Sequence, residues 1–204
     1  MQAIIFDIDG TLLDSFDTDG EMFADAIRAV LGNVRIREAW GMYEHVTDNG
    51  ILADVARDND LDLTPAIARA IEKNHLERLT HHVDTHGPFT EIPGARDYVS
   101  GLMRRSDVCI AYATGAWRTS AMLKLTSAGF PLSGIPLATS DDHHERAHIM
   151  RHALSQLPQP VKSITYYGDG EWDMTATSRL GWNFVPVGAK LGGLTRFESK
   201  VTDL

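Results

Sequence analysis

The fold is decided near the start of the chain, where residues 3–14 read AIIFDIDGTLLD. Residues 3–6 are an unbroken apolar run, which is typical of a short strand buried on both faces of a sheet. The run stops at Asp7, and a second carboxylate follows at Asp9. Two carboxylates at positions i and i+2 of a loop can both face one cleft. This stretch therefore predicts a buried strand that ends in a ligand site.

Further along the chain, from residue 88 onward, apolar runs alternate with helical patterns. The runs that predict strands are residues 108–113, 135–138, 164–167 and 184–187. Helical patterns separate them, the last at about residues 171–180. Such alternation is typical of an α/β protein, so we expect a Rossmann-like parallel sheet core with helices on both faces.

Between these parts, residues 15–87 show helical periodicity and no convincing strand. Residues 14–20 are polar and acidic, which favours a linker. We expect Asp48 to cap one helix and Thr64 followed by proline to start the next. The predicted organisation is a core of residues 1–14 and 88–204, with an all-α segment of residues 15–87 inserted after the first strand.

Composition narrows the function. The 204 residues include 28 acidic and 19 basic side chains, for a net charge of −9, so non-specific nucleic-acid binding is a poor hypothesis. No apolar run reaches the roughly 18 residues that a membrane span needs. The single cysteine, Cys109, favours a reducing compartment, and the first residues show no secretory signal pattern. We therefore expect a cytoplasmic protein without nucleic-acid or membrane partners.

Polar residues also follow the later strands. Thr114 and Gly115 follow the run at 108–113, Asp169 follows the run at 164–167, and Asp173 lies one helical turn further on. The carboxyl ends of parallel strands share one edge of a sheet, so this order favours one site over separate solvated loops. Converging carboxylates need a cation, and oxygen ligands suit Mg²⁺. The converging residues are Asp7, Asp9, Asp169 and Asp173.

Three motifs resemble those of the haloacid-dehalogenase-like hydrolase superfamily. Residues 7–14 (DIDGTLLD) resemble its first motif, residues 112–115 (YATG) its second, and residues 167–173 (YGDGEWD) its fourth. They occur in family order and span nearly the whole chain. The helical insertion resembles the cap of the phosphoglycolate-phosphatase-like branch.

The resemblance implies a role for each matching residue. Asp7 would be the nucleophile that forms an aspartyl phosphate, and Asp9 the general acid and base. Thr114 and the Gly115 amide would hold the phosphoryl oxygens. The implied Mg²⁺ ligands are Asp7, the backbone carbonyl of Asp9, Asp169 and Asp173.

The family's third motif is usually a lysine, and here the sequence departs from the pattern. Residues 140–157 contain no lysine, but Arg146 lies 23 positions before Asp169, about where the lysine is expected. Arginine is always charged and can grip phosphate with two nitrogens, so we expect Arg146 to take this role. The alternatives are a solvated Arg146, or Arg151 further along the helix.

The resulting hypothesis is a Mg²⁺-dependent phosphatase that hydrolyses a small phosphorylated metabolite. Relatives that dehalogenate haloacids lack the second aspartate, so the presence of Asp9 disfavours that reaction. Relatives that hydrolyse phosphonates also lack it and need a lysine in the cap, where Lys73 is the only lysine in residues 15–87. A phosphomutase shares every core motif and stays an alternative. From a different class, a phospho-acceptor signalling or non-catalytic binding module is disfavoured by the position of Asp7 and by the intact aspartate pair.

Several polar and aromatic features have two readings. The polar stretch at residues 45–50 either enters the site or forms an ordinary turn between helices. For His144, His148 and His152, spaced by four, a solvated helix face is favoured over Zn²⁺ binding. The aromatic residues that follow the second and fourth motifs, Trp117 and Trp172, are expected to pack helices rather than stack on substrate.

Overall fold

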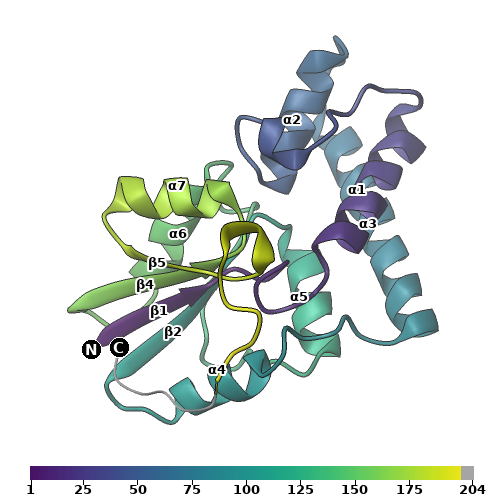
Figure 1. The fold of residues 1–204 in the computed structure, drawn as a ribbon. Helices are drawn as coiled ribbons and strands as arrows, with labels where there is room; N and C mark the ends of the chain where they lie inside the picture. Colours follow the sequence, from purple (N-terminus) through teal and green to yellow (C-terminus); the bar gives the residue numbers. More distant parts are fainter. Residues whose placement is uncertain (199–204) are drawn as a thin grey trace.

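The computed structural model describes residues 1–198, and at its centre lies a five-stranded parallel sheet with the order β3-β2-β1-β4-β5 (Figure 1). The strands are β1 (Gln2–Phe6), β2 (Val108–Ala113), β3 (Leu137–Ala138), β4 (Ser163–Gly168) and β5 (Asn183–Pro186). The predicted Rossmann-like α/β fold is therefore confirmed. The expected strand at 135–138 is shorter than predicted, and the one at 184–187 begins one residue earlier.

Helices cover both faces of the sheet. They are α4 (Ala95–Met103), α5 (Arg118–Ser127), α6 (Arg146–Ser155) and α7 (Glu171–Leu180). In β1, Ile4 and Phe6 belong to the hydrophobic cluster that includes α4 and α5, whereas Ala3 and Ile5 belong to the cluster that includes α6 and α7. Because successive strand side chains point to opposite faces, burial of both faces requires an unbroken apolar run.

A third hydrophobic cluster joins the helices that lie between β1 and α4. These are α1 (Phe16–Leu31), α2 (Asp48–Asp58), α3 (Pro65–His86) and the 3-10 helix η1 (Trp40–Met42). Phe23, Leu52 and Ile71 form its centre, and Trp117, from the segment between β2 and α5, inserts into it. Figure 1 shows α1, α2 and α3 to one side of the sheet. No strand occurs in residues 15–87, all of which the structure describes.

The predicted linker at residues 14–20 is wrong, because α1 already begins at Phe16. Two acidic residues, Asp17 and Asp19, occupy its first turn, where they complement the positive end of the helix dipole. Gly20 is tolerated in the helix because a Cβ there would meet the Trp40 ring nitrogen at 2.6 Å. The glycine therefore serves close packing rather than chain flexibility.

The predicted cap at Asp48 is also wrong by one residue. Thr47 is the N-cap of α2, and its side-chain oxygen accepts a hydrogen bond from the Gly50 amide at 3.1 Å. Asp48 instead accepts a hydrogen bond from the Trp117 amide at 2.7 Å. The predicted cap at Thr64 is confirmed, since its side chain accepts from the Ile67 amide.

Two further observations complete the fold. A short 3-10 helix, η2 (Ala189–Leu191), follows β5. Within residues 1–198, no helix has the length and apolar character needed to cross a membrane.

Candidate active site

The register of the sheet brings distant segments to one edge. Phe6 of β1 lies opposite Tyr112 of β2 on one side and Tyr167 of β4 on the other. The chain leaves all three strands within the next two residues, and the Asp7 amide still donates to the Tyr167 carbonyl at 2.9 Å. Polar residues that follow these strands therefore share one edge, where ligands bind in open α/β sheets.

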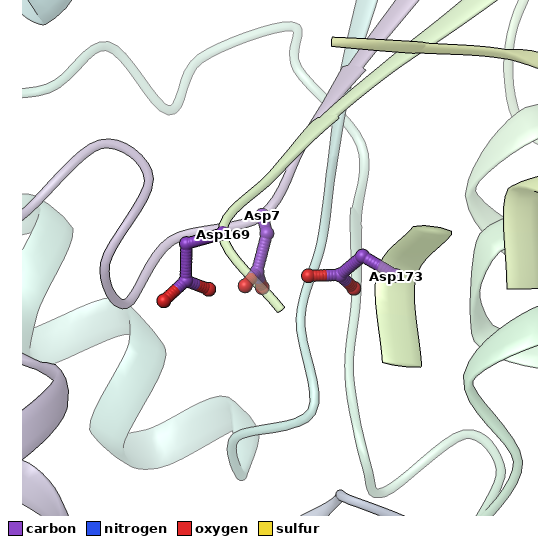
Figure 2. Close-up of side chains that lie close together, drawn as sticks. All are labelled: Asp7, Asp169 and Asp173. Carbon is purple, nitrogen blue, oxygen red and sulfur yellow. The ribbon is translucent and has the colours of Figure 1, made fainter. Parts of the chain in front are cut away.

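Three buried carboxylates meet at this edge and form what we call the carboxylate cluster (Figure 2). Its members are Asp7, Asp169 and Asp173. One oxygen from each lies within 4.8 Å of the others, and the residues are 3%, 7% and 0% exposed. Figure 2 shows that the side chains come from the end of β1, the end of β4 and the first turn of α7.

Burial dominates the electrostatics of the carboxylate cluster. It raises the pKa of Asp7 well above its ordinary value, and the neighbouring carboxylates add to the effect while Arg146 opposes it. Burial likewise raises the pKa of Asp169 to about 7, and it raises the pKa of Asp173. A bound divalent cation would reverse this penalty by stabilising the ionised carboxylates.

The carboxylate cluster fits a hard divalent cation. Asp169 Oδ1 is buried and has no hydrogen-bond partner among the described residues, so an acceptor stands ready for a ligand. Gly10, with φ of 75°, lies directly against the Asp169 carboxylate, and a Cβ there would collide with it. Carboxylate oxygens are the donors that Mg²⁺ prefers, whereas Zn²⁺ sites in proteins usually include histidine or cysteine.

Arg146 is the cation within this cluster. It is the first residue of α6, and its Nη1 donates to Asp7 Oδ1 at 3.2 Å while its Nε lies 3.4 Å from Asp173 Oδ1. Burial lowers its pKa, but the charges of Asp173 and Asp7 outweigh burial and raise it. Its Nη2 donates to the Val46 carbonyl at 3.1 Å. The structure thus brings Arg146 to the nucleophile candidate, and Arg151 is exposed on the same helix.

Thr114 and Gly115 lie beside Arg146 at the same edge of the sheet. Thr114 is 1% exposed, and its side-chain oxygen accepts from the Ala116 amide at 3.2 Å. A Cβ at Gly115 would meet the Val46 carbonyl at 2.7 Å and Arg146 Nη2 at 2.9 Å. Only glycine therefore lets the backbone approach this closely.

Two adjoining cavities reach the strand ends. An inner cavity of about 60 Å³ is lined by Asp7, Asp9, Thr114, Gly115 and Arg146, among others. An outer cavity of about 1240 Å³ lies between α1 and α7 and includes Asp169 in its lining. The residues that line both cavities are Phe16, Gly20, Trp40, Val46, Arg146 and Trp172.

Aromatic rings dominate the boundary between the two cavities. Phe16 and Trp172 stack with ring centroids 5.9 Å apart. Trp172 therefore lines the cavity as well as packing against α1, whereas Trp117 is 2% exposed and packs against Phe23, as expected for a helix-packing residue.

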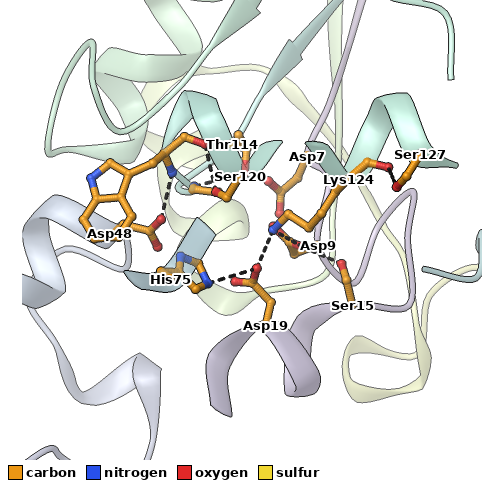
Figure 3. A network of polar contacts seen from close by, with 12 residues as sticks. Asp7, Asp9, Ser15, Asp19, Asp48, His75, Thr114, Ser120, Lys124 and Ser127 are labelled. Carbon is orange, nitrogen blue, oxygen red and sulfur yellow. Dashed lines mark hydrogen bonds and ion pairs between the residues drawn. The ribbon is translucent and has the colours of Figure 1, made fainter. Parts of the chain in front are cut away.

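Asp9 points to a second group of charges, which the sequence did not indicate. Lys124 Nζ lies 2.7 and 2.8 Å from the two oxygens of Asp9 and 2.8 Å from Asp19 Oδ1 (Figure 3). We call Asp9, Asp19 and Lys124 the lysine network. Lys124 is fully buried on α5, and the only sequence signal was a lysine on the face that carries Ala121 and Leu125.

The lysine network continues into the inserted helices. His75 of α3 lies 3.5 Å from Asp19, and Asp48 of α2 interacts electrostatically with both. Burial lowers the pKa of His75, but the charge and hydrogen bond of Asp19 outweigh it and raise the pKa. Burial raises the pKa of Asp48 to about 7. Every inserted α-helix thus supplies one of these groups.

The stretch at residues 45–50 lies against the core rather than forming a free turn. Thr47 donates to the His144 carbonyl at 2.8 Å, the Asp48 amide donates to the Gly115 carbonyl at 2.8 Å, and the Asn49 side chain donates to the Ser140 carbonyl at 2.9 Å.

Of the histidines spaced by four in the α6 region, His148 lies on the exposed surface, where its ring contacts that of a further histidine, His143, at 2.9 Å.

A parallel α/β fold with a buried acidic cluster, an arginine and a cavity at its strand ends has the arrangement of a ligand-binding site of α/β proteins. The chain belongs to the haloacid dehalogenase-like hydrolase family, whose model matches residues 1–181. The membership predicted from the three motifs is therefore confirmed. No curated protein sequence matches the chain.

Solved structures share the fold at low identity. A hydrolase from Pseudomonas syringae is 22% identical, with 91% of this chain and 84% of that chain covered and a TM-score of 0.67. CbbY from Rhodobacter sphaeroides, in complex with phosphate, is 20% identical over 98% and 91% of the two chains, with a TM-score of 0.64. A predicted phosphoglycolate phosphatase from Haemophilus somnus is 16% identical over 90% and 84%, with a TM-score of 0.61.

Proposed function

We propose that this protein is a Mg²⁺-dependent phosphatase that hydrolyses a small phosphomonoester through an aspartyl phosphate on Asp7. The observation that carries the proposal is the inner cavity, around which Asp7, Asp9 and Arg146 converge beside two further buried carboxylates. The phosphate complex of CbbY, which has the same fold, supports a small phosphorylated substrate.

The metal would be held by the carboxylate cluster together with the backbone carbonyl of Asp9. When bound, Mg²⁺ supplies positive charge that offsets the negative charge of the phosphoryl oxygens and of the carboxylates. Even with one of the three carboxylates protonated, two negative charges lie beside the one positive charge of Arg146. A further cation is therefore electrostatically favoured there.

The covalent chemistry falls to two aspartates. Asp7 attacks phosphorus through a carboxylate oxygen, which forms the acyl phosphate bond as the ester P–O bond breaks. Asp9 gives its proton to the departing oxygen, so that the leaving group departs as an alcohol. Asp9 then takes a proton from water, whose oxygen attacks phosphorus and releases Asp7 and inorganic phosphate.

Three further groups would bind and orient the phosphoryl group. Arg146 donates through its guanidinium, Thr114 through its hydroxyl and Gly115 through its backbone amide. Such preorganised donors contribute most of the rate in phosphoryl transfer, because the transition state needs positioning and charge stabilisation.

We further propose that residues 15–87 act as a cap over a core of residues 1–14 and 88–204. Support comes from the hydrogen bonds that residues 47–49 make at the strand ends and from the lining of both cavities by α1. A cap in this position excludes water and contacts the leaving group. We propose the cytoplasm as the compartment, in keeping with a single cysteine.

Phosphate release tests the proposal. Purified protein with Mg²⁺ is screened against phosphorylated metabolites, and we expect inorganic phosphate from at least one of them. A phosphomutase would instead return an isomer of its substrate without net phosphate release, and a binding module would do neither. Absence of both phosphate release and isomerisation across sugar, nucleotide and small-acid phosphates would contradict the proposal.

A further inference from the structure

Lys124, which lies outside the carboxylate cluster, is a fully buried lysine held by two carboxylates. Its Nζ reaches both oxygens of Asp9, from the loop after β1, and one oxygen of Asp19, from α1. The side chain is 0% exposed, whereas those of Asp9 and Asp19 are 13% and 12% exposed. A buried ammonium group is retained only where several partners satisfy it, so these contacts hold Lys124 firmly in place.

The contacts distinguish the two oxygens of Asp9. A carboxylate has about four acceptor positions, two on each oxygen. Oδ1 receives the Ser15 hydroxyl at 2.5 Å and Lys124 at 2.7 Å, whereas Oδ2 receives Lys124 alone at 2.8 Å among the described residues. Oδ2 is therefore the oxygen with an acceptor position left for a ligand, and Asp9 lines the inner cavity.

We propose that Lys124 is a positioning residue that fixes the rotation of the Asp9 carboxylate, so that Oδ2 carries the proton exchanged with the leaving oxygen. The inference rests on the proposed function and goes beyond it by assigning the atom and the residue that orients it. Within residues 1–198, the ion pairs of Lys124 are with Asp9 and Asp19 and not with Asp7, so Lys124 acts through Asp9.

Asp19 extends the same device to the inserted helices. It holds Lys124 at 2.8 Å and is itself 3.5 Å from His75 of α3. Burial raises the pKa of Asp19, but Lys124 and His75 outweigh it and hold the pKa well below its ordinary value, so Asp19 stays ionised. The orientation of Asp9 therefore depends on α1 lying against the core.

The test compares two substrates that differ in their need for a proton. The leaving group of p-nitrophenyl phosphate departs readily without one, whereas the more basic leaving group of phenyl phosphate depends on general acid catalysis. In Lys124→Met we expect kcat for phenyl phosphate to fall about tenfold or more beyond any fall for p-nitrophenyl phosphate, with KM for both nearly unchanged. Lys124→Arg should restore part of the difference.

Controls separate positioning from folding. Lys124→Met removes the cation that Asp9 and Asp19 share, so the double variant Asp19→Asn/Lys124→Met, which removes one charge of each sign, is measured beside it. Lys73→Met, at an exposed lysine of α3, is the matched control and should behave as wild type. Thermal unfolding is followed for every variant.

The outcomes are distinct. A selective loss for phenyl phosphate in the folded single or double variant supports the inference. An equal loss for both substrates, or no loss, overturns it while leaving the phosphatase proposal intact. A wild-type protein that hydrolyses neither ester and forms no phosphoenzyme overturns the proposed function and the inference together.

Discussion

The carboxylate cluster and the lysine network begin two residues apart, at Asp7 and Asp9, yet they differ in charge balance. In the carboxylate cluster of three buried carboxylates, Arg146 is the basic side chain at ion-pair distance within residues 1–198, and Lys190 acts on Asp169 from further away. In the lysine network, Asp9 and Asp19 share Lys124, and His75 adds a second basic group. The first region is left with excess negative charge, and the second is nearly balanced by the protein itself.

This difference supports the separate roles that we propose for the two aspartates. A buried site with excess carboxylates is favourable only when it is protonated or binds a cation, which suits a metal-assisted nucleophile. A balanced network is satisfied without a ligand and is suited to holding a group in one orientation. The different environments support the roles that we propose for these residues, bond formation for Asp7 and proton transfer for Asp9.

The strongest test of this division is Asp7→Asn. An amide is a very poor nucleophile, so turnover should fall by about a thousandfold or more while the fold stays intact. Phosphate release and phosphoenzyme formation are measured with radiolabelled substrate. Asp97→Asn, the same change on the exposed part of α4, is the control and should keep wild-type turnover. Aspartyl phosphate that still forms on Asp7→Asn would assign the nucleophile elsewhere.

Arg146→Ala should lower kcat/KM at least about tenfold, because charge-assisted hydrogen bonds contribute roughly 1.5–3 kcal/mol. Arg146→Lys should recover part of the loss, since lysine keeps the charge without the planar fork. Arg151→Ala removes an exposed arginine of the same helix and serves as the matched control. Wild-type kcat/KM in Arg146→Ala would show that the arginine only balances charge.

The smallest expected effect concerns pH and the inserted helices. Because the pKa of Asp48 is about 7 in the fold and 3.8 as its ordinary value, the folded state binds more protons between these limits. The contribution of Asp48 to stability is therefore fully present below about pH 4 and is lost as the pH rises through 7. The groups that face Asp48 are His75, Asp19 and Lys124.

Denaturant unfolding across this range measures the effect. The free energy of unfolding of wild type, relative to that of Asp48→Asn, should fall by at least about 1 kcal/mol between pH 4 and pH 8. The comparison removes the contributions of other titrating groups. A difference between the two proteins that stays constant, or rises with pH, would contradict the buried, protonated state of Asp48.

Local sequence patterns predicted much of the fold and the edge where the site lies. The apolar run of β1 is unbroken because both faces of the sheet are covered, and the residues after β1, β2 and β4 meet because parallel strands end at one edge. Arg146 was predicted from its spacing to Asp169, and the structure brings it within 3.2 Å of Asp7.

The sequence failed where distant partners decide the structure. Lys124 reads as an ordinary helical lysine, since its partners Asp9 and Asp19 are more than a hundred residues away. The start of α1 was missed because Gly20 is typical of a linker in the sequence. In the structure the glycine is needed because the Trp40 ring packs against it. The role of Asp48 depends on the Trp117 amide, which no local pattern reveals.

Binding of Mg²⁺ to the protein without substrate tests the central contrast most directly. Calorimetric titration should show one Mg²⁺ per chain for wild type, at least about tenfold weaker binding for Asp169→Asn, and unchanged binding for Asp19→Asn. Asp169 belongs to the carboxylate cluster and Asp19 to the lysine network, so only the first loss removes a ligand. Absence of Mg²⁺ binding by wild type, or equal affinity in Asp169→Asn, would contradict the account.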